Sequence, residues 1–190
     1  MGPTAKVRFC LGISGLAVFL AALARSQSTA PPVAARIGRT APDFSLTDDA
    51  GHPWHLRSLT GEPVVLLFAC GCSDCSKLIA AFAKHRPQHT QILVISSLAP
   101  GVVDKLIVRR GGNGLFPGLF DPFAKVAARY SALSCPSLWA VNSQQVICYE
   151  KPPGRAPPDV LVRQALEAVG ERATEFRHPK PPAGWSPRER

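Results

Sequence analysis

The chain has 190 residues, of which 46% are hydrophobic and 18% charged, so it can bury one ordinary core and leaves little room for a second domain. Its net charge is +9, from 22 basic and 13 acidic side chains. The basic residues are scattered and mixed with acidic ones, without a basic helix face, which argues against nucleic acid as a partner.

The N-terminus resembles a secretory signal. Lys6 and Arg8 form a basic start, an apolar run covers residues 9–24, and the run ends in the small-x-small triplet Ala22-Leu23-Ala24. We therefore expect export to the periplasm or another extracytoplasmic compartment. The run is about 16 residues long, whereas a spanning helix needs about 20. Cleavage of residues 1–24 is favoured, and an uncleaved membrane anchor through residues 9–24 is the alternative.

The folded domain is expected to span residues 37–173. It follows residues 25–36, which are rich in Ser, Ala and Pro and are predicted to form a linker. Near its start, residues 44–46 and 54–56 flank a turn-forming segment, which predicts a short β-hairpin. Pro53 confines the second strand to the edge of a sheet because proline has no backbone N–H to donate.

The centre of the domain alternates between strand and helix patterns. Residues 64–69 form a continuous apolar run, as a buried central strand requires. Apolar side chains then recur at helical spacing over residues 76–84, in a helix that starts near Ser73. Residues 91–96 predict a second buried strand and residues 102–110 a second helix. This alternation indicates a parallel core.

The last third of the chain predicts smaller elements. Residues 123–130 are expected to form a short helix, and residues 137–141 and 146–149 two strands joined by a polar loop. Residues 159–172 predict a final helix. The tail, residues 174–190, is rich in proline and mixed charge, and we expect it to be disordered.

Three cysteines, Cys70, Cys72 and Cys75, gather where the first buried strand meets the first helix. Cys72 lies at the helix N-terminus, where unpaired N–H groups and the helix dipole favour a thiolate. Cys75 lies one turn later on the same face, close enough to resolve a mixed disulfide formed at Cys72. The carboxylate of Asp74 opposes the thiolate, so we expect only a moderate lowering of the Cys72 pKa.

Thiol–disulfide exchange is therefore the favoured function, with Cys72 and Cys75 as the catalytic residues. A metal-binding module is the main alternative, in which Cys70, Cys72 and Cys75, with or without Cys135, hold Cu(I) or Zn(II). Peroxide reduction and an inert structural disulfide are two further alternatives. Cys70 fits a buried apolar position as well as a redox role.

The chain resembles the redoxin branch of the thioredoxin-like superfamily, which includes the alkyl hydroperoxide reductase/thiol-specific antioxidant proteins and exported thiol-disulfide oxidoreductases. Residues 37–46 resemble the opening motif of that branch and residues 116–122 its inserted segment. Residues 134–137, Ser-Cys-Pro-Ser, are similar to its cis-proline loop. The resemblance implies an α/β, thioredoxin-like fold with a central mixed sheet flanked by helices and an N-terminal hairpin extension.

The resemblance also implies site residues and partners. Pro136 would be a cis-proline beside the redox pair, and Cys135 and Pro136 would bind the substrate peptide. The partners would be protein thiols and disulfides, and no cofactor is needed. Cys135 either packs into the core as a small apolar side chain or contacts the pair as a third thiol. The family's peroxidatic pattern Pro-x-x-x-Thr/Ser-x-x-Cys is missing, because Ala69 stands three residues before Cys72.

Overall fold

The computed structural model describes residues 34–99, 101–109, 112 and 115–171. The expected signal or anchor at residues 1–24, most of the expected linker and the expected tail lie outside these residues. Among the helices in the described ranges, none has the length and apolar character needed to cross a membrane.

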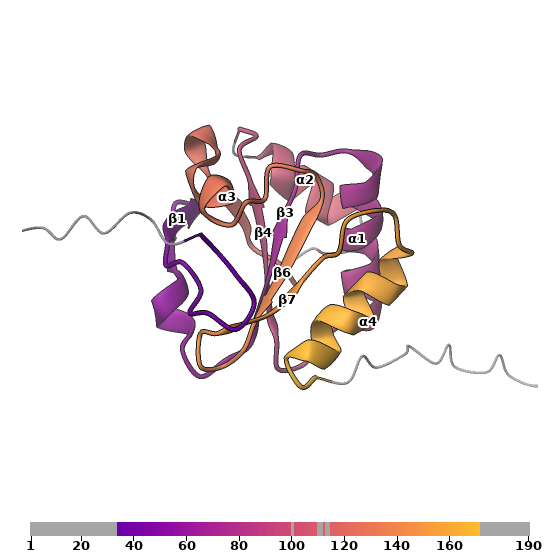
Figure 1. The fold of residues 1–190 in the computed structure, drawn as a ribbon. Coiled ribbons are helices and arrows are strands. Elements are labelled where there is room, and N and C mark those ends of the chain that lie inside the picture. The colour runs from indigo at the N-terminus through magenta and orange to yellow at the C-terminus, as the bar shows by residue number, and fades with distance from the viewer. Residues whose placement is uncertain (1–33, 100, 110–111, 113–114, 172–190) are drawn as a thin grey trace, which may run out of the picture. The chain divides into compact units, whose positions relative to one another are not determined.

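A seven-stranded sheet in the order β2-β1-β5-β4-β3-β6-β7 organises the domain (Figure 1). Its centre is parallel, with β3 (Val64–Phe68), β4 (Gln91–Ser96) and β5 (Gly118–Phe120) side by side. The strand β6 (Ser137–Val141) runs antiparallel to β3, and β7 (Ile147–Glu150) runs antiparallel to β6. The predicted mixed sheet is therefore confirmed.

The predicted N-terminal hairpin is present and extends the sheet beyond β5. It pairs β1 (Ser45–Asp48) with β2 (Pro53–His55), and β1 also pairs antiparallel with β5. Pro53 lies in the edge strand, as predicted. Asp48 stabilises the turn, because its Oδ1 accepts hydrogen bonds from the backbone N–H groups of Ala50 at 3.0 Å and His52 at 2.8 Å.

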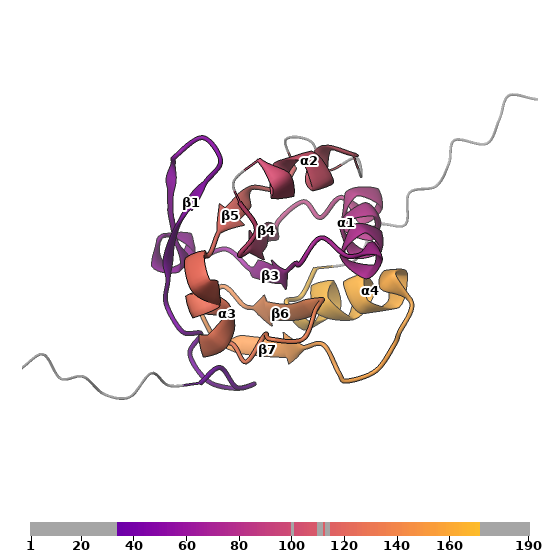
Figure 2. The ribbon, with the colours of Figure 1, turned by 90° about the horizontal axis from the view of Figure 1, so that it is seen from above.

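The helices cover the two faces of the sheet unequally. Three longer helices pack on one face, and one short helix and two 3-10 turns lie on the other (Figures 1 and 2). The first group is α1 (Ser73–His85), α2 (Val102–Arg109) and α4 (Pro158–Ala168), and the second is α3 (Lys125–Arg129) with the turns Leu56–Leu59 and Pro122–Ala124.

The core follows from the alternation of side chains along the buried strands. In β3, Val65 and Leu67 point towards α1 and α4, whereas Leu66 and Phe68 point towards α3. Tyr130 is buried in the core on the α3 side of the sheet. Its ring contacts Phe68 with centroids 5.5 Å apart, and its hydroxyl donates to the carbonyl of Pro42 at 2.7 Å. The β3 strand is thus buried on both faces, as its apolar run predicts.

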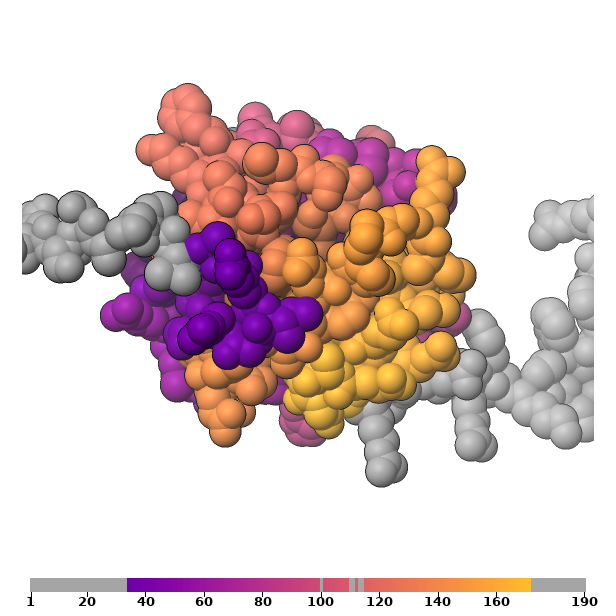
Figure 3. Space-filling model, viewed as in Figure 1, coloured from indigo at the N-terminus to yellow at the C-terminus, as the bar shows by residue number. Residues whose placement is uncertain are grey.

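The chain before β1 packs against the start of β7 (Figure 3). The N–H of Gly38 donates to the carbonyl of Ile147 at 2.8 Å, and the N–H of Ile147 donates to Arg39 at 2.9 Å. Ala35 is buried and its N–H donates to Arg129 at 2.9 Å. The end of the predicted linker is therefore part of the folded domain.

Some predicted boundaries differ from the structure. The helix predicted over residues 159–172 ends at Ala168, because Gly170 adopts a φ of +83°. The helix predicted over residues 123–130 begins at Lys125, because Phe123 and Ala124 both have positive φ. The strand β5 was not predicted, since three residues containing a glycine give no alternation to detect.

Candidate active site

The turn from β3 into α1 places the first cysteines. Gly71 adopts a φ of +80°, and a Cβ at this position would lie 3.2 Å from Leu98 Cδ1, so glycine suits both the conformation and the space. Cys72 then takes the N-cap position with an extended backbone, φ −68° and ψ 170°, and α1 begins at Ser73 as predicted. The Cys72 side chain therefore lies beside the unpaired N–H groups of the first turn.

The two predicted catalytic sulfurs are in contact. Cys72 Sγ donates a hydrogen bond to Cys75 Sγ at 3.4 Å. Cys72 is half-buried, whereas Cys75 has no exposed surface. Lys77 forms an ion pair with Asp74 at 2.9 Å, which offsets the negative charge that Asp74 places near the pair. Only Cys72 of the two is open to a large substrate.

The pairing of β3 with β6 brings Cys135 next to Cys72 and Cys75. In the antiparallel pairing of β3 and β6, Phe68 lies opposite Ser137, and two further residues bring Cys70 opposite Cys135. Cys135 Sγ lies 3.1 Å from Cys75 Sγ and accepts a hydrogen bond from the N–H of Cys70 at 3.0 Å. Cys135 is exposed, so its interpretation as a buried core residue is wrong. The Cys135-Pro136 bond is cis, as the resemblance implies.

All five cysteines in the described residues are free thiols. Cys70 is exposed, which excludes its alternative as a buried apolar side chain. Four sulfurs, those of Cys70, Cys72, Cys75 and Cys135, lie within 4.8 Å of one another. Cys148 stands apart in β7, where its Sγ donates to the carbonyl of Ala140 at 3.4 Å.

Within the cluster of four thiols, the thiolate form of Cys75 is stabilised. The hydrogen bond from Cys135, with further donors from Cys70 and Cys72, lowers the pKa of Cys75 to about 5 against the opposing effect of burial. Burial raises the pKa of Cys72, and the hydrogen bond to Cys75 raises that of Cys135. The position of Cys72 at the helix N-terminus predicted a lowered pKa for Cys72. In the structure the lowered pKa is at Cys75, because the thiols of Cys135, Cys72 and Cys70 all donate to it.

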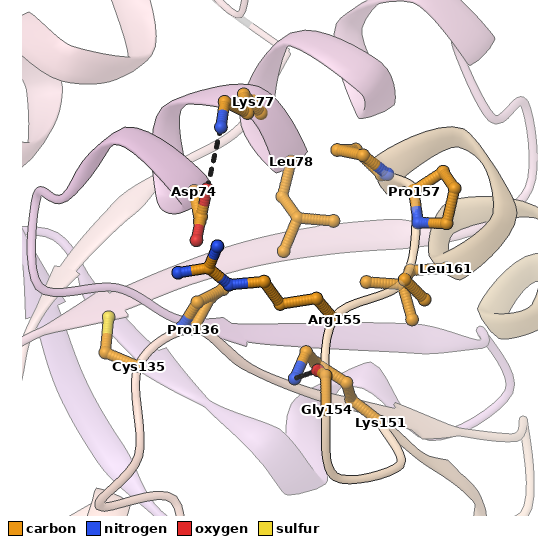
Figure 4. Close-up of a pocket in the computed structure, with 12 residues that line it drawn as sticks. Asp74, Lys77, Leu78, Cys135, Pro136, Lys151, Gly154, Arg155, Pro157 and Leu161 are labelled. Carbon is orange, nitrogen blue, oxygen red and sulfur yellow. Dashed lines mark hydrogen bonds and ion pairs between the residues drawn. The ribbon is translucent and has the colours of Figure 1, made fainter.

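A groove of about 550 Å³ opens beside Cys135 and Pro136 (Figure 4). Leu78 and Leu161 form apolar walls, and the guanidinium of Arg155 points towards Asp74. Within the described residues, that guanidinium has no hydrogen bond or ion pair. Two more cations complete the lining, so that three basic groups, Lys77, Lys151 and Arg155, face one acidic group, Asp74.

Leu133, beside Cys135, and Phe123, before α3, are large apolar side chains that are exposed. Leu133 is 76% exposed and lines a smaller pocket together with Cys70 and Cys135. Phe123 is 88% exposed, with the ammonium of Lys125 5.6 Å from its ring centroid. A large apolar group left in water beside a reactive site, as Leu133 is, is typical of a contact surface for another protein. The exposure of both side chains could not be predicted from the sequence, because an exposed leucine or phenylalanine has no pattern of its own.

The comparisons with known proteins agree on family and fold. The AhpC/TSA family matches residues 37–150. A proposed protein disulfide isomerase from Bacteroides thetaiotaomicron is 25% identical with a TM-score of 0.60, over 72% of this chain and 92% of that one. No curated protein matches the sequence.

Two proteins of Mycobacterium tuberculosis share the fold. A secreted disulfide oxidoreductase homologous to Escherichia coli DsbE is 21% identical with a TM-score of 0.55, over 67% of this chain and 94% of that one. The peroxidoxin BcpB is also 21% identical, with a TM-score of 0.58, over 72% of this chain and 97% of that one. At this identity the likeness establishes the fold alone.

Proposed function

We propose that this chain, which belongs to the AhpC/TSA family, exchanges disulfides with protein substrates through Cys72 and Cys75. The family places it among oxidoreductases, and the predicted family and thioredoxin-like fold are confirmed. The observation that carries the proposal is the chain of sulfur contacts from Cys72 to Cys75 and on to Cys135, at 3.4 and 3.1 Å, beside the groove.

Cys72 is the attacking sulfur, because it is the member of the pair that a protein disulfide can reach. Its proton passes to the Cys75 thiolate across the 3.4 Å contact, so Cys75 acts as the general base. The Cys72 thiolate then attacks one sulfur of the substrate disulfide. A mixed disulfide forms, and the other substrate sulfur leaves as a thiolate that takes the proton from Cys75.

The second step starts with Cys75 again a thiolate, which is the form needed to resolve the mixed disulfide. Its sulfur attacks Cys72, the protein disulfide Cys72-Cys75 forms, and the second substrate sulfur leaves and takes a proton from solvent. One substrate disulfide has then become two thiols, and two cysteines of the protein have supplied the two electrons. The same steps in reverse oxidise a substrate dithiol.

The groove would hold the polypeptide on one side of the substrate cysteine. Pro136 forms its end nearest the sulfurs, and its apolar walls suit an extended chain. Because three cations oppose one carboxylate there, acidic side chains near the substrate cysteine would bind better than basic ones. Leu133, exposed beside Cys135, would contact the same substrate.

We place this exchange outside the cytoplasm. The support is the secretory pattern of residues 1–24, which lie outside the described residues, and the likeness to a secreted oxidoreductase. In this proposal a linker that begins at residue 25 and ends before the buried Ala35 joins the leader or anchor to a redoxin domain that reaches residue 173.

For this chain, peroxide reduction is less favoured than disulfide exchange. The family's peroxidatic cysteine follows a Thr or Ser by three residues, whereas Ala69 precedes Cys72 and Cys72 precedes Cys75 at that distance. No hydroxyl from this position can therefore polarise a bound peroxide.

Trapping of the mixed disulfide tests the proposal. In Cys75→Ser the resolving sulfur is gone, so a protein disulfide substrate should remain attached to Cys72. The double variant Cys75→Ser/Cys135→Ser should trap more if Cys135, which lies within 4.8 Å of Cys72, can resolve in its place. Cys148→Ser is the control and should turn over without trapping. An adduct on any cysteine other than Cys72, or none at all, contradicts the mechanism.

A further inference from the structure

Two thiols of the site have no covalent role in the proposed exchange. Cys70 and Cys135 nevertheless lie with Cys72 and Cys75 so that all four Sγ atoms are within 4.8 Å of one another. In the described part of the chain, no other three Cys, His, Asp or Glu side chains bring their ligand atoms together in this way. Four convergent sulfurs are the donor set of a soft metal ion.

We propose that the reduced site binds one Zn²⁺ ion through Cys70, Cys72, Cys75 and Cys135, and that oxidation of Cys72 and Cys75 releases it. The site stands on its own geometry, whereas its release rests on the proposed exchange function. A tetrahedral zinc site with Zn–S bonds of about 2.3 Å places its sulfurs about 3.8 Å apart. Two Sγ–Sγ distances in the cluster are 3.4 and 3.1 Å, and no two of its sulfurs are more than 4.8 Å apart. Movements of the side chains by about 1 Å therefore suffice to form the tetrahedral site.

The backbone brings the four ligands from two distant segments. Three follow each other at the end of β3 and the start of α1, and the fourth stands before β6, where the β3–β6 register places it opposite Cys70. Cys75 forms the buried floor of the cluster, whereas Cys70 and Cys135 are exposed. An ion can therefore enter from solvent without opening the core.

The surroundings suit the charge of the loaded site. One Zn²⁺ with four thiolates carries a net charge of 2−. The cations Lys77, Lys151 and Arg155 line the adjoining groove (Figure 4), and the positive end of α1 adjoins Cys72. The N–H of Cys70, 3.0 Å from Cys135 Sγ, adds a hydrogen bond to one of the sulfurs.

The redox step balances with a substrate disulfide as the oxidant. The loaded site, with its four thiolates, reacts with one disulfide and four protons. The products are the Cys72-Cys75 disulfide, two substrate thiols, the protonated thiols of Cys70 and Cys135, and free Zn²⁺. Two sulfurs each lose one electron, and the substrate disulfide gains both. Two remaining thiols are too few for the tetrahedral site, so the ion leaves.

Zinc titration of the reduced full chain against a chromophoric chelator tests the site. Wild type should bind one equivalent. Cys70→Ser and Cys135→Ser should each weaken binding by at least about tenfold, because each removes a ligand. Cys148→Ser, whose sulfur lies outside the cluster, should bind as wild type does. Substitution with Co²⁺ should give the absorption of a tetrahedral thiolate complex, which falls stepwise in the two ligand variants.

Release is measured by adding oxidised glutathione to the zinc-loaded wild type. One Zn²⁺ should appear for each Cys72-Cys75 disulfide formed. Zinc binding below one equivalent, or binding unchanged in both Cys70→Ser and Cys135→Ser, would overturn the four-sulfur site. Zinc retained by the fully oxidised protein would overturn the release. Exchange assayed separately in metal-free wild type keeps failure of the exchange function distinct from failure of the metal site.

Discussion

Replacement of Cys135 by alanine should raise the pKa of Cys75 by about 1–2 units. The hydrogen bond from Cys135, at 3.1 Å, is the largest cause that lowers this pKa to about 5. A hydrogen bond to a charged group contributes about 1.5–3 kcal/mol. One pKa unit corresponds to about 1.4 kcal/mol, so Cys135→Ala should bring the Cys75 pKa to about 6–7.

The consequence for activity depends on pH. With a pKa of about 5, about nine tenths of Cys75 is thiolate at pH 6, and with a pKa of about 6–7 the share is about one half to one tenth. Exchange by Cys135→Ala at pH 6 should therefore be about two- to tenfold slower than wild type, whereas at pH 8 the two should agree within about twofold.

The assay combines two measurements on chelator-treated protein. The carbon chemical shift of Cys75 Cβ, followed over a pH series, reports the pKa directly, and stopped-flow kinetics with a disulfide peptide report the rate. Cys148→Ala is the matched control, because it also removes one thiol, but that thiol donates its hydrogen bond to the carbonyl of Ala140 rather than to another cysteine. If the Cys75 pKa in Cys135→Ala is unchanged or lower, the argument that Cys135 stabilises the thiolate fails.

Four further predictions concern the groove, stability, access and peroxide. Arg155→Glu should lower kcat/KM for an acidic disulfide peptide by about fivefold, because reversing one charge about 8 Å from a peptide carboxylate in water changes their interaction free energy by about 1 kcal/mol. The control Arg163→Glu, on the exposed surface of α4, should have little effect. Unfolding by urea should show that the free energy of unfolding of the reduced protein increases as pH rises from about 5 to 9. The lowered pKa of Cys75 stabilises the folded state fully at a pH above 9.0, the pKa of the unfolded thiol, and this stabilisation is lost as pH falls through about 5. A flat or falling profile would count against the lowered pKa of Cys75. A bulky maleimide, located by peptide mapping, should modify Cys72 before Cys75, because Cys75 has no exposed surface; the reverse order would exclude Cys72 as the accessible nucleophile. Hydrogen peroxide should be consumed slowly with a thiol reductant, and fast consumption that disappears in Cys72→Ser would favour a peroxidase.

Local patterns were enough to predict the centre of the fold. The apolar run of residues 64–69 and the helical spacing that follows Ser73 depend on neighbouring residues alone, and both elements are present as β3 and α1. The short strand β5 was missed because its pairing with β4 and β1, not its own pattern, makes it a strand. The resemblance to a family supplied the topology that periodicity could not.

The candidate site was predictable only in part. The spacing of Cys72 and Cys75 is local, and helix geometry brings their sulfurs together. The contact between Cys75 and Cys135 joins residues 60 positions apart, so the sequence left it open. The charge distribution depends on that contact, which is why the lowered pKa was expected at Cys72.

The register between β3 and β6 also determines at which stage of folding the four-cysteine site forms. Five residue pairs align these strands, and the pairing carries Cys135 to the end of β3. In a chain that has not yet docked β6, nothing holds Cys135 beside Cys70, Cys72 and Cys75. A newly made molecule that is oxidised at that stage can form bridges other than Cys72-Cys75, including bridges to Cys135 or Cys148. Complete assembly of the sheet must therefore precede the chemistry, and a reducing environment during folding should increase the yield of active protein.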